Sequence, residues 1–141
     1  MKYHFKIKKE KTGYSASCIE LNGCRTQANT LEELQENMRE ALDAYLDEPA
    51  TSKEILPIPN EKIKGRNIKG VECDVCIAFA LLVRQARLKH NLTQRNVAKK
   101  LGYKNVFAYQ KLENTKTANP TLTTIKKIKD VFPRLNLKIV F

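Results

Sequence analysis

The sequence predicts an α+β protein in which a small antiparallel sheet with one helix precedes an all-helical domain that ends in a strand. Three observations support this fold class. Apolar and polar residues alternate between residues 3 and 28, apolar residues recur every three or four positions between 31 and 45, and helical spacing returns between 77 and 131. The chain has 141 residues, of which 42% are apolar, so two small folded domains are possible.

Residues 3–28 are expected to form three strands. In the first strand, side chains alternate between a buried and a polar face at Tyr3, His4, Phe5, Lys6, Ile7 and Lys8. Residues 14–18 alternate in the same way, and residues 24–28 form a short third strand. Asn22-Gly23 favours a hairpin turn between the last two strands, because both residues tolerate a positive φ.

The clearest helix in the chain covers residues 31–45. Its apolar residues share one face and are Leu31, Leu34, Met38, Ala41, Leu42 and Tyr45. Thr30 and Glu33 form a capping box, in which each side chain accepts from the other residue's backbone N–H. The opposite face is acidic and carries Glu32, Glu33, Glu36, Glu40, Asp43 and Asp47. It is either a solvated face or a docking surface for a basic partner.

Proline and glycine mark the boundaries that follow this helix. Pro49 ends it, because proline cannot continue the helical hydrogen bonding. Residues 55–59, with two prolines, are expected to be an edge strand or an extended segment. The predicted organisation is a first module at 1–60, a linker at 61–70 and a second domain at 71–141, which residues 71–76 enter as a short strand.

Charge is distributed unevenly between the two halves of the chain. Residues 1–65 hold ten basic and eleven acidic residues, a net charge of −1. Residues 66–141 hold sixteen basic and four acidic residues, a net charge of +12. Such a surplus in one domain indicates a polyanion binder, the alternative being a soluble basic surface.

The sequence contains no recognisable catalytic or metal-binding set. Cys73 and Cys76 have C-x-x-C spacing, but Cys18 and Cys24 do not form a second pair with zinc-ribbon spacing, so core packing is the favoured role. His4 is expected on the surface, and no nucleophile–base pair can be assembled. We therefore expect no enzyme, no cofactor and no metal. Because no apolar run approaches the roughly 20 residues of a membrane span, we expect a cytoplasmic protein.

The first module resembles the HicB antitoxins of bacterial HicA–HicB toxin–antitoxin pairs over roughly residues 3–60. The matching positions are Glu20, Leu21, Asn22, Gly23, Cys24, Thr30, Glu33, Asn37, Pro57, Ile58 and Pro59. One departure is Ala28-Asn29, where family members often have Gly-Asp. The resemblance implies a partial RNase H-like β-β-β-α-β fold that has lost catalysis and holds a toxin inactive. We assign toxin binding to Glu32, Glu33, Glu36 and Glu40 of the acidic face.

Two short helices joined by a tight turn are predicted within residues 92–113. A helix at 77–89, with Asn91 as a C-cap, precedes them. The residues that cap the first short helix, make the turn and face inward on the second are Thr93, Gly102, Tyr109 and Leu112. The pattern resembles the Xre/Cro-like helix-turn-helix family over about residues 78–133, at Leu92, Thr93, Gln94, Val97, Ala98, Leu101 and Gly102. One extra residue follows Gly102, which shifts the register of the second helix.

In that family the second helix enters the major groove of DNA. Carried over to this sequence, the candidates for contact with bases are Asn105, Val106, Phe107, Gln110 and Lys111. The candidates for contact with phosphates are Gln94, Lys104, Asn114 and Lys116. For Phe107, packing in the core is an equally good interpretation.

The C-terminal residues 135–141 alternate and predict a strand that pairs with the same strand of a second subunit. The dimer contacts would be Leu137, Ile139 and Phe141. Together these features predict an antitoxin that neutralises a small HicA-type mRNA-cleaving ribonuclease toxin and represses its own operon by binding operator DNA. The alternative functions are a stand-alone transcription regulator whose first module senses a ligand and, in another class, a nuclease that uses Glu10 or Glu20.

Overall fold

A computed structural model describes residues 1–141 and divides the chain into two compact units. Unit 1 comprises residues 1–46 and 56–74, and unit 2 comprises residues 47–55 and 75–141. The chain therefore passes between the units at three points. The α+β fold class is confirmed, with a sheet and one long helix in unit 1 and helices only in unit 2.

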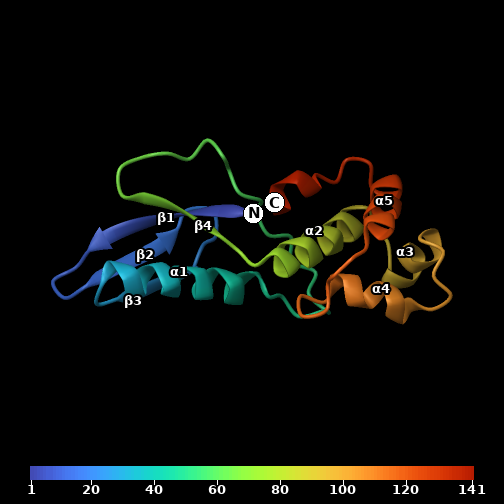
Figure 1. Ribbon diagram of the computed structural model, residues 1–141, viewed down its shortest axis with the longest axis horizontal. Coiled ribbons are helices and arrows are strands. Elements are labelled where there is room, and N and C mark those ends of the chain that lie inside the picture. Colours follow the sequence, from blue (N-terminus) through green and yellow to red (C-terminus); the bar gives the residue numbers. More distant parts are fainter. The chain divides into compact units, whose positions relative to one another are not determined.

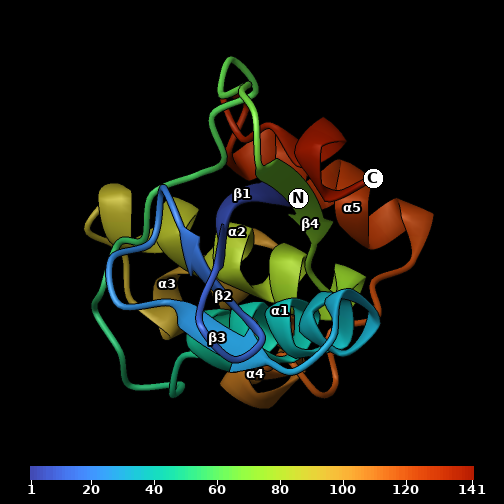
Figure 2. The same cartoon turned by 90° about the vertical axis from the view of Figure 1, so that its left-hand side faces the viewer.

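Unit 1 is a four-stranded antiparallel sheet with one long helix packed on it (Figures 1 and 2). Its elements are β1 (Lys2–Lys9), β2 (Tyr14–Cys18), β3 (Arg25–Ala28), α1 (Leu31–Leu46) and β4 (Ile68–Glu72), and the strand order is β3-β2-β1-β4. The β-β-β-α-β order is as predicted. Of the two alternatives for residues 55–59, the edge strand is wrong, because these residues form no strand and β4 is the fifth element instead.

The fourth strand also corrects the predicted domain boundary. Residues 68–72 were expected to lie partly in the linker and partly at the entrance of the second domain. Instead Lys2 pairs with Glu72 and Lys6 with Ile68, so β4 extends the sheet of unit 1 beside β1. Gly70 interrupts the alternation of apolar and polar residues in β4, and only Val71 is buried. The sequence of β4 therefore has little of the pattern that predicts a strand.

The core of unit 1 lies between one face of the sheet and the apolar face of α1. The fully or almost fully buried side chains are Tyr3, Phe5, Ala16, Leu21, Leu34, Met38, Leu42 and Leu46. Leu31 was expected in this core but is 50% exposed. Glu33 N–H donates to Thr30 Oγ1 as expected, whereas the Glu33 carboxylate accepts from Asn29 N–H rather than from Thr30.

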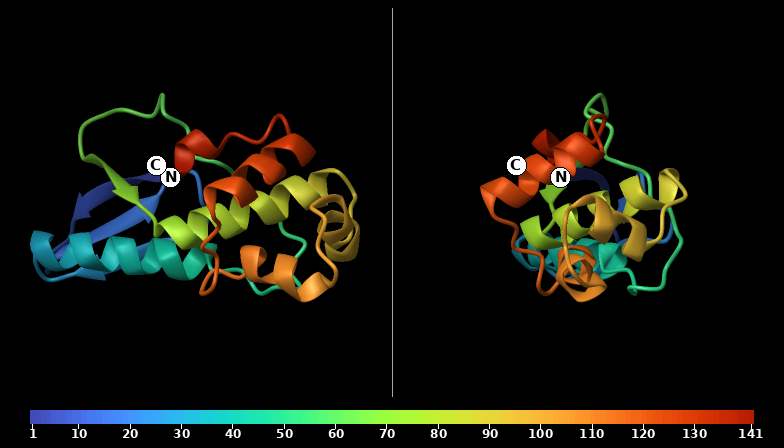
Figure 3. Two further views of the ribbon diagram at one scale, coloured as in Figure 1. Left: turned by 45° about the vertical axis from the view of Figure 1, so that its right-hand side comes forward. Right: turned by 90° about the vertical axis from the view of Figure 1, so that its right-hand side faces the viewer.

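Unit 2 is built around a helix that other helices surround. Its elements are α2 (Val75–Lys89), α3 (Gln94–Lys100), α4 (Val106–Glu113), α5 (Leu122–Val131) and the 3-10 helix η1 (Leu137–Val140). In Figures 1 and 3, α4 and α5 lie on opposite sides of α2. Every residue from 78 to 87 is accordingly buried. No helix of the protein is both long and apolar enough to cross a membrane.

The predicted C-terminal strand is wrong. Residues 137–140 form η1, with Leu137 and Val140 buried, Ile139 partly exposed and Phe141 88% exposed. Alternation at Leu137, Ile139 and Phe141 suggested a strand, but the buried positions are three residues apart, which is the spacing of a 3-10 turn. These residues therefore do not form the proposed intersubunit strand, and η1 packs against α2 of its own unit.

Candidate nucleic-acid interface

The two short helices and their turn form as predicted. Thr93 Oγ1 accepts from Asn96 N–H at 3.0 Å and the Asn96 side chain accepts from Thr93 N–H at 3.0 Å, a complete capping box at the start of α3. Gly102 has a φ of +82° just after α3, a conformation in which a Cβ is unfavourable. Asn91, with a φ of +54°, ends the preceding helix as expected.

The start of α4 resolves the uncertain register of the second helix. Asn105 is the N-cap, and its Oδ1 accepts from Ala108 N–H at 3.3 Å. The helix therefore begins at Val106, which is partly exposed, while Phe107 is 69% exposed. Tyr109 and Leu112 point inward, as predicted. Phe107 is not a core residue, so the exposed residues at the start of α4 are available to a ligand.

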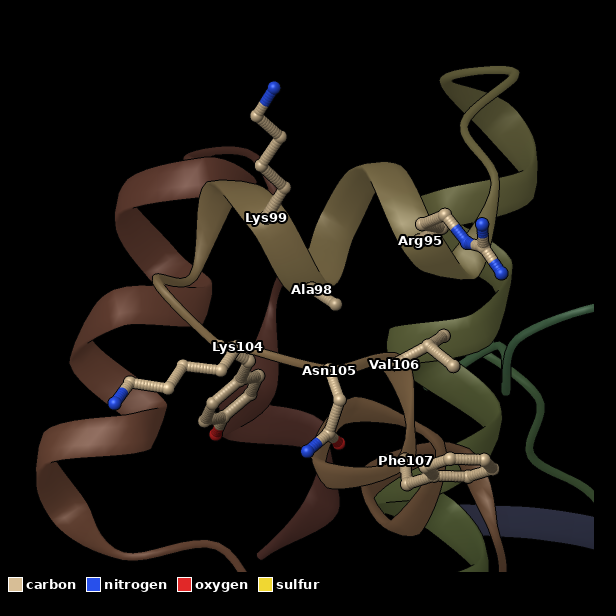
Figure 4. Close-up of a pocket in the computed structure, with 8 residues that line it drawn as sticks. Arg95, Ala98, Lys99, Lys104, Asn105, Val106 and Phe107 are labelled. Atoms are coloured by element: carbon tan, nitrogen blue, oxygen red, sulfur yellow. The ribbon is translucent and has the colours of Figure 1, made fainter.

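A cleft of about 450 Å³ lies between α3 and the start of α4. Its lining residues are Arg95, Ala98, Lys99, Tyr103, Lys104, Asn105, Val106 and Phe107. In Figure 4, the small side chain of Ala98 points from α3 into the opening, while Lys99 and Lys104 extend outward. Cations at the edge and an apolar ring with an amide at the helix start are the groups that contact phosphates and bases, respectively.

A buried carboxylate holds the two helices together beneath this surface. Arg87 Nε lies 2.5 Å from Glu113 Oε1 and Arg87 Nη2 lies 3.0 Å from Glu113 Oε2. Tyr109 OH donates to Glu113 Oε1 at 2.5 Å, and Gln94 Nε2 donates to Oε2 at 2.9 Å. Burial and the adjacent Glu113 charge raise the pKa of Tyr109, so its hydroxyl stays a donor. The network ties α2, α3 and α4 to one carboxylate.

This carboxylate also fixes the orientation of two amides at the surface. Glu113 can only accept, so Gln94 must present its Nε2 to Glu113 and its Oε1 to Gln110. Gln110 Nε2 donates to that Oε1 at 3.1 Å. The side-chain oxygen of Gln110 and the second N–H of its amide therefore remain free to bind a ligand. They form an acceptor beside a donor. That pair matches the edge of adenine in the major groove.

Three of the remaining predicted DNA-contact residues lie on exposed surface, and Gln94 does not. Lys111 is exposed on α4, and Asn114 is exposed as its C-cap. Lys116 is exposed in the following turn, where its backbone N–H donates to Asn114 Oδ1 at 2.9 Å. Gln94, expected to contact phosphate, is only partly exposed, and its amide groups are already hydrogen-bonded within the network.

Sequence reasoning missed three features of this interface. Arg95 and Lys99 belong to the lining of the cleft, and their i, i+4 spacing on one helix could have revealed them. The buried pair of Arg87 and Glu113 has no local sequence signal, because 26 positions separate the partners. Residues 50–53 line a second cleft with Gln94, Arg95, Val106 and Gln110, although the sequence placed them in the first module.

Arg84 holds the segment of residues 47–55 in unit 2. Its side chain is almost fully buried, and Nη1 donates to the carbonyl oxygens of Glu48 and Pro49, both at 3.1 Å. Thr115 Oγ1 donates to Asp47 Oδ1 at 2.5 Å. Burial lowers the pKa of Arg84, and the charges of Glu113 and Glu48 partly offset this effect. The end of the first module is therefore part of the helical unit.

In unit 1, the predicted toxin-contact residues share an exposed helix face. Glu32, Glu33, Glu36 and Glu40 are all exposed on α1.

The prediction that His4 lies on the surface is wrong. Its side chain is only partly exposed, and its Nδ1 lies 2.6 Å from Glu20 Oε1. Glu20 also accepts from the N–H groups of His4 and Asn60. Cys73 is buried in unit 1, whereas Cys76 lies on α2 in unit 2.

The fold and the interface of unit 2 define a helix-turn-helix DNA-binding domain, and the helix-turn-helix family profile matches residues 83–136. The chain belongs to the UPF0150 family, which it matches over part of its length. A UPF0150 protein of Archaeoglobus fulgidus is 42% identical to it over 48 residues, which are 33% of this chain and 70% of that protein. A UPF0150 protein of Synechocystis is 34% identical over 64 residues, which are 43% of this chain and 78% of that protein.

Proposed function

We propose that the protein is an antitoxin, which binds and neutralises a small, basic HicA-type ribonuclease and represses its own operon. The observation that carries the proposal is that one chain has two surfaces of opposite charge, one in each unit. Unit 1 presents the four exposed glutamates of α1, and unit 2 presents a helix-turn-helix with exposed lysines and Arg95 around its cleft. One surface suits a cationic protein and the other suits DNA.

The acidic face of α1 is the proposed toxin contact. Glu32, Glu36 and Glu40 repeat every four residues along an exposed helix, which gives a continuous negative stripe. A basic ribonuclease carries cations where it binds RNA phosphates, so the same cations can pair with this stripe. Inhibition then follows from occlusion, because the bound antitoxin and RNA compete for one surface.

The antitoxin is proposed to act without catalysis of its own. The pKa of Glu20 is lowered: burial raises it, but the hydrogen bonds from His4, from its own backbone N–H and from Asn60 N–H together outweigh burial. Its oxygens are occupied by His4 and the Asn60 N–H. A carboxylate held in this way stabilises the loop at Asn60 and has little capacity left for a substrate. This arrangement favours a binding role for the RNase H-like unit.

Repression is proposed to follow from binding of a homodimer to operator DNA. Helix-turn-helix proteins bind two half-sites about one helical turn apart, which matches a two-fold symmetric dimer. Base contacts are assigned to Asn105, Val106, Phe107, Gln110 and Lys111. Phosphate contacts are assigned to Lys104, Asn114 and Lys116, with Arg95 and Lys99 added from the cleft.

Cleavage of mRNA by a small basic HicA-type ribonuclease tests the proposal. The full chain at equimolar concentration should abolish cleavage, and a variant with glutamine at positions 32, 33, 36 and 40 should inhibit less. A matched control replaces Lys126, Lys127 and Lys129 by glutamine and should inhibit like the native chain. If the native chain leaves cleavage unchanged, the antitoxin proposal is wrong, and a stand-alone regulator with a ligand-sensing first module becomes the better account.

A further inference from the structure

Cys18 and Cys24 lie directly opposite each other across the hairpin of β2 and β3. The strand register pairs Ser17 with Arg25, which makes the two cysteines the next pair. Cys18 N–H donates to the carbonyl oxygen of Cys24 at 2.8 Å, so the ladder continues to this pair. In a hydrogen-bonded antiparallel pair the Cα atoms are about 5.5 Å apart, which lies within the usual Cα separation of a disulfide.

Both side chains lie on the face of the sheet that α1 covers. Cys18 is opposite the buried Phe5 in the register, and Cys24 Sγ donates to the carbonyl oxygen of Ala41 on α1 at 3.7 Å. Cys18 and Cys24 are 7% and 3% exposed, respectively. The loop between them is more open, since Ile19 is 46% exposed and Asn22 and Gly23 are exposed. A short, exposed loop at an edge strand can open without disrupting the helix.

The two thiols are also electronically unequal. The interaction between the two adjacent thiols raises the pKa of Cys18 and lowers that of Cys24, and burial raises the Cys18 pKa further. The carboxylate of Glu20 lies 3.6 Å from Cys18 Sγ and disfavours its thiolate. The contact of Cys18 with a carboxylate favours Cys24 as the attacking thiol and Cys18 as the resolving thiol.

We propose that Cys18 and Cys24 form a redox-sensitive dithiol, which closes to an intramolecular disulfide by exchange with a small-molecule disulfide such as oxidised glutathione. The Cys24 thiolate attacks one sulfur of the small disulfide, forms a mixed disulfide and releases one thiolate. Cys18, after losing its proton, attacks Cys24 Sγ and releases the second thiolate. The two protons from the cysteines convert both released thiolates to thiols, so one protein disulfide is formed and one small disulfide is reduced.

Formation of the disulfide would change the hydrogen bonds between the hairpin and the residues around it. The bond removes both S–H donors, so the contacts of Cys24 with Ala41 and of Cys18 with Glu20 are lost. Glu20 also holds the backbone of Asn60, and Ala41 belongs to α1. Oxidation is thus coupled to the helix whose outer face carries the acidic stripe. This inference stands independently of the toxin and DNA proposals.

Equilibration of the full chain in glutathione redox buffers tests the proposal. The chain is then quenched with acid, alkylated with N-ethylmaleimide and cleaved after Lys and Arg residues. The resulting peptide 12–25 contains both Cys18 and Cys24. Its intramolecular disulfide is two hydrogens lighter than the dithiol and carries no label. Because the fold holds the two sulfurs together, the native chain should reach half-oxidation at a ratio of oxidised to reduced glutathione about tenfold below that of the chain in urea. A variant with serine at Cys73 and Cys76 should behave identically.

Three results would overturn the proposal. The first is a native pair that oxidises less readily than the unfolded chain, which would mean that the fold protects the thiols. The second is accumulation of mixed disulfide alone, which would mean that Cys18 cannot reach Cys24. The third is a disulfide that involves Cys73 or Cys76 instead. A C18S variant should retain the mixed disulfide at Cys24, and its failure to form one would contradict the assigned nucleophile.

Discussion

Arg87 and Glu113 form a buried bidentate ion pair between α2 and the last residue of α4, with N–O distances of 2.5 and 3.0 Å. Their side chains are 9% and 1% exposed. The hydrogen bonds from Gln94 and Tyr109 complete the acceptor sites of the carboxylate. The pair therefore positions α4, the helix assigned to the major groove, from inside the domain, although neither residue is on the DNA-contact surface.

Glu113→Gln should destabilise unit 2 strongly. The substitution leaves Arg87 charged and buried without a counter-ion, which costs about 3–5 kcal/mol in comparable buried pairs. The measurement is the urea midpoint of unfolding, at unchanged dependence on urea. Asp130→Asn is the matched control. It removes the exposed pair of Asp130 with Lys126, so its cost should stay below about 1 kcal/mol. Equal midpoints for the two variants would contradict the structural role of Glu113.

Two substitutions at Asn105 should separate helix capping from DNA binding. Asn105→Ala removes the acceptor for Ala108 N–H and should cost about 1 kcal/mol of stability. Asn105→Asp keeps an N-cap acceptor and should leave stability nearly unchanged. Both variants should bind operator DNA more weakly, because the first loses the amide and the second places a negative charge beside phosphates. Operator binding by Asn105→Asp at native affinity would remove Asn105 from the interface.

Salt should distinguish the two kinds of DNA contact. Lys116→Gln should weaken binding to all sequences alike and reduce the slope of log K against log salt by about one, because one fewer counterion is released. Lys111→Gln should instead relax the preference at particular base pairs. Fluorescence anisotropy with operator and scrambled duplexes over a series of salt concentrations measures both effects. Affinity that is indifferent to salt would rule out the assigned phosphate contacts.

Acid should weaken unit 1 through Glu20. Its pKa in the folded state lies below the ordinary value, since burial raises it less than the hydrogen bonds from His4, Glu20 N–H and Asn60 N–H together lower it. The stability that it contributes is present above the unfolded-state pKa and is lost as pH falls through the folded-state pKa. From about pH 5 downward, the native unfolding free energy should therefore fall more steeply than that of Glu20→Gln. Parallel curves for the two proteins would contradict this role of Glu20.

The elements that the sequence predicted well are those with a strong local pattern. Alternation from Tyr3 to Phe5 located β1, and the Thr93 cap and Gly102 located the two ends of α3. The face of α1 followed from the spacing of Leu34, Met38 and Leu42. In each case neighbouring residues carry the whole signal, so no knowledge of distant contacts was needed.

The features that sequence reasoning missed depend on partners far away in the chain. Strand β4 exists because β1 has a free edge, and its own residues show almost no alternation. The network at Glu113 requires α2 to pass behind α4, which no local pattern reveals. The tail was mistaken for a strand because a 3-10 turn that buries Leu137 and Val140 also contains an apolar residue between them. Long-range packing decided each of these cases.

The most direct test of the antitoxin account is the dissociation constant between the full chain and a small basic HicA-type ribonuclease, measured by isothermal titration calorimetry. Three chains are compared: the native chain, the chain with glutamine at Glu32, Glu33, Glu36 and Glu40, and the chain with glutamine at Lys104, Lys111 and Lys116. We predict that the α1 variant binds the toxin about tenfold or more weakly, a loss of about 1.4 kcal/mol, while the lysine variant binds it like the native chain but loses operator DNA. Equal toxin affinities for the α1 variant and the native chain, or no binding by the native chain, would contradict the account.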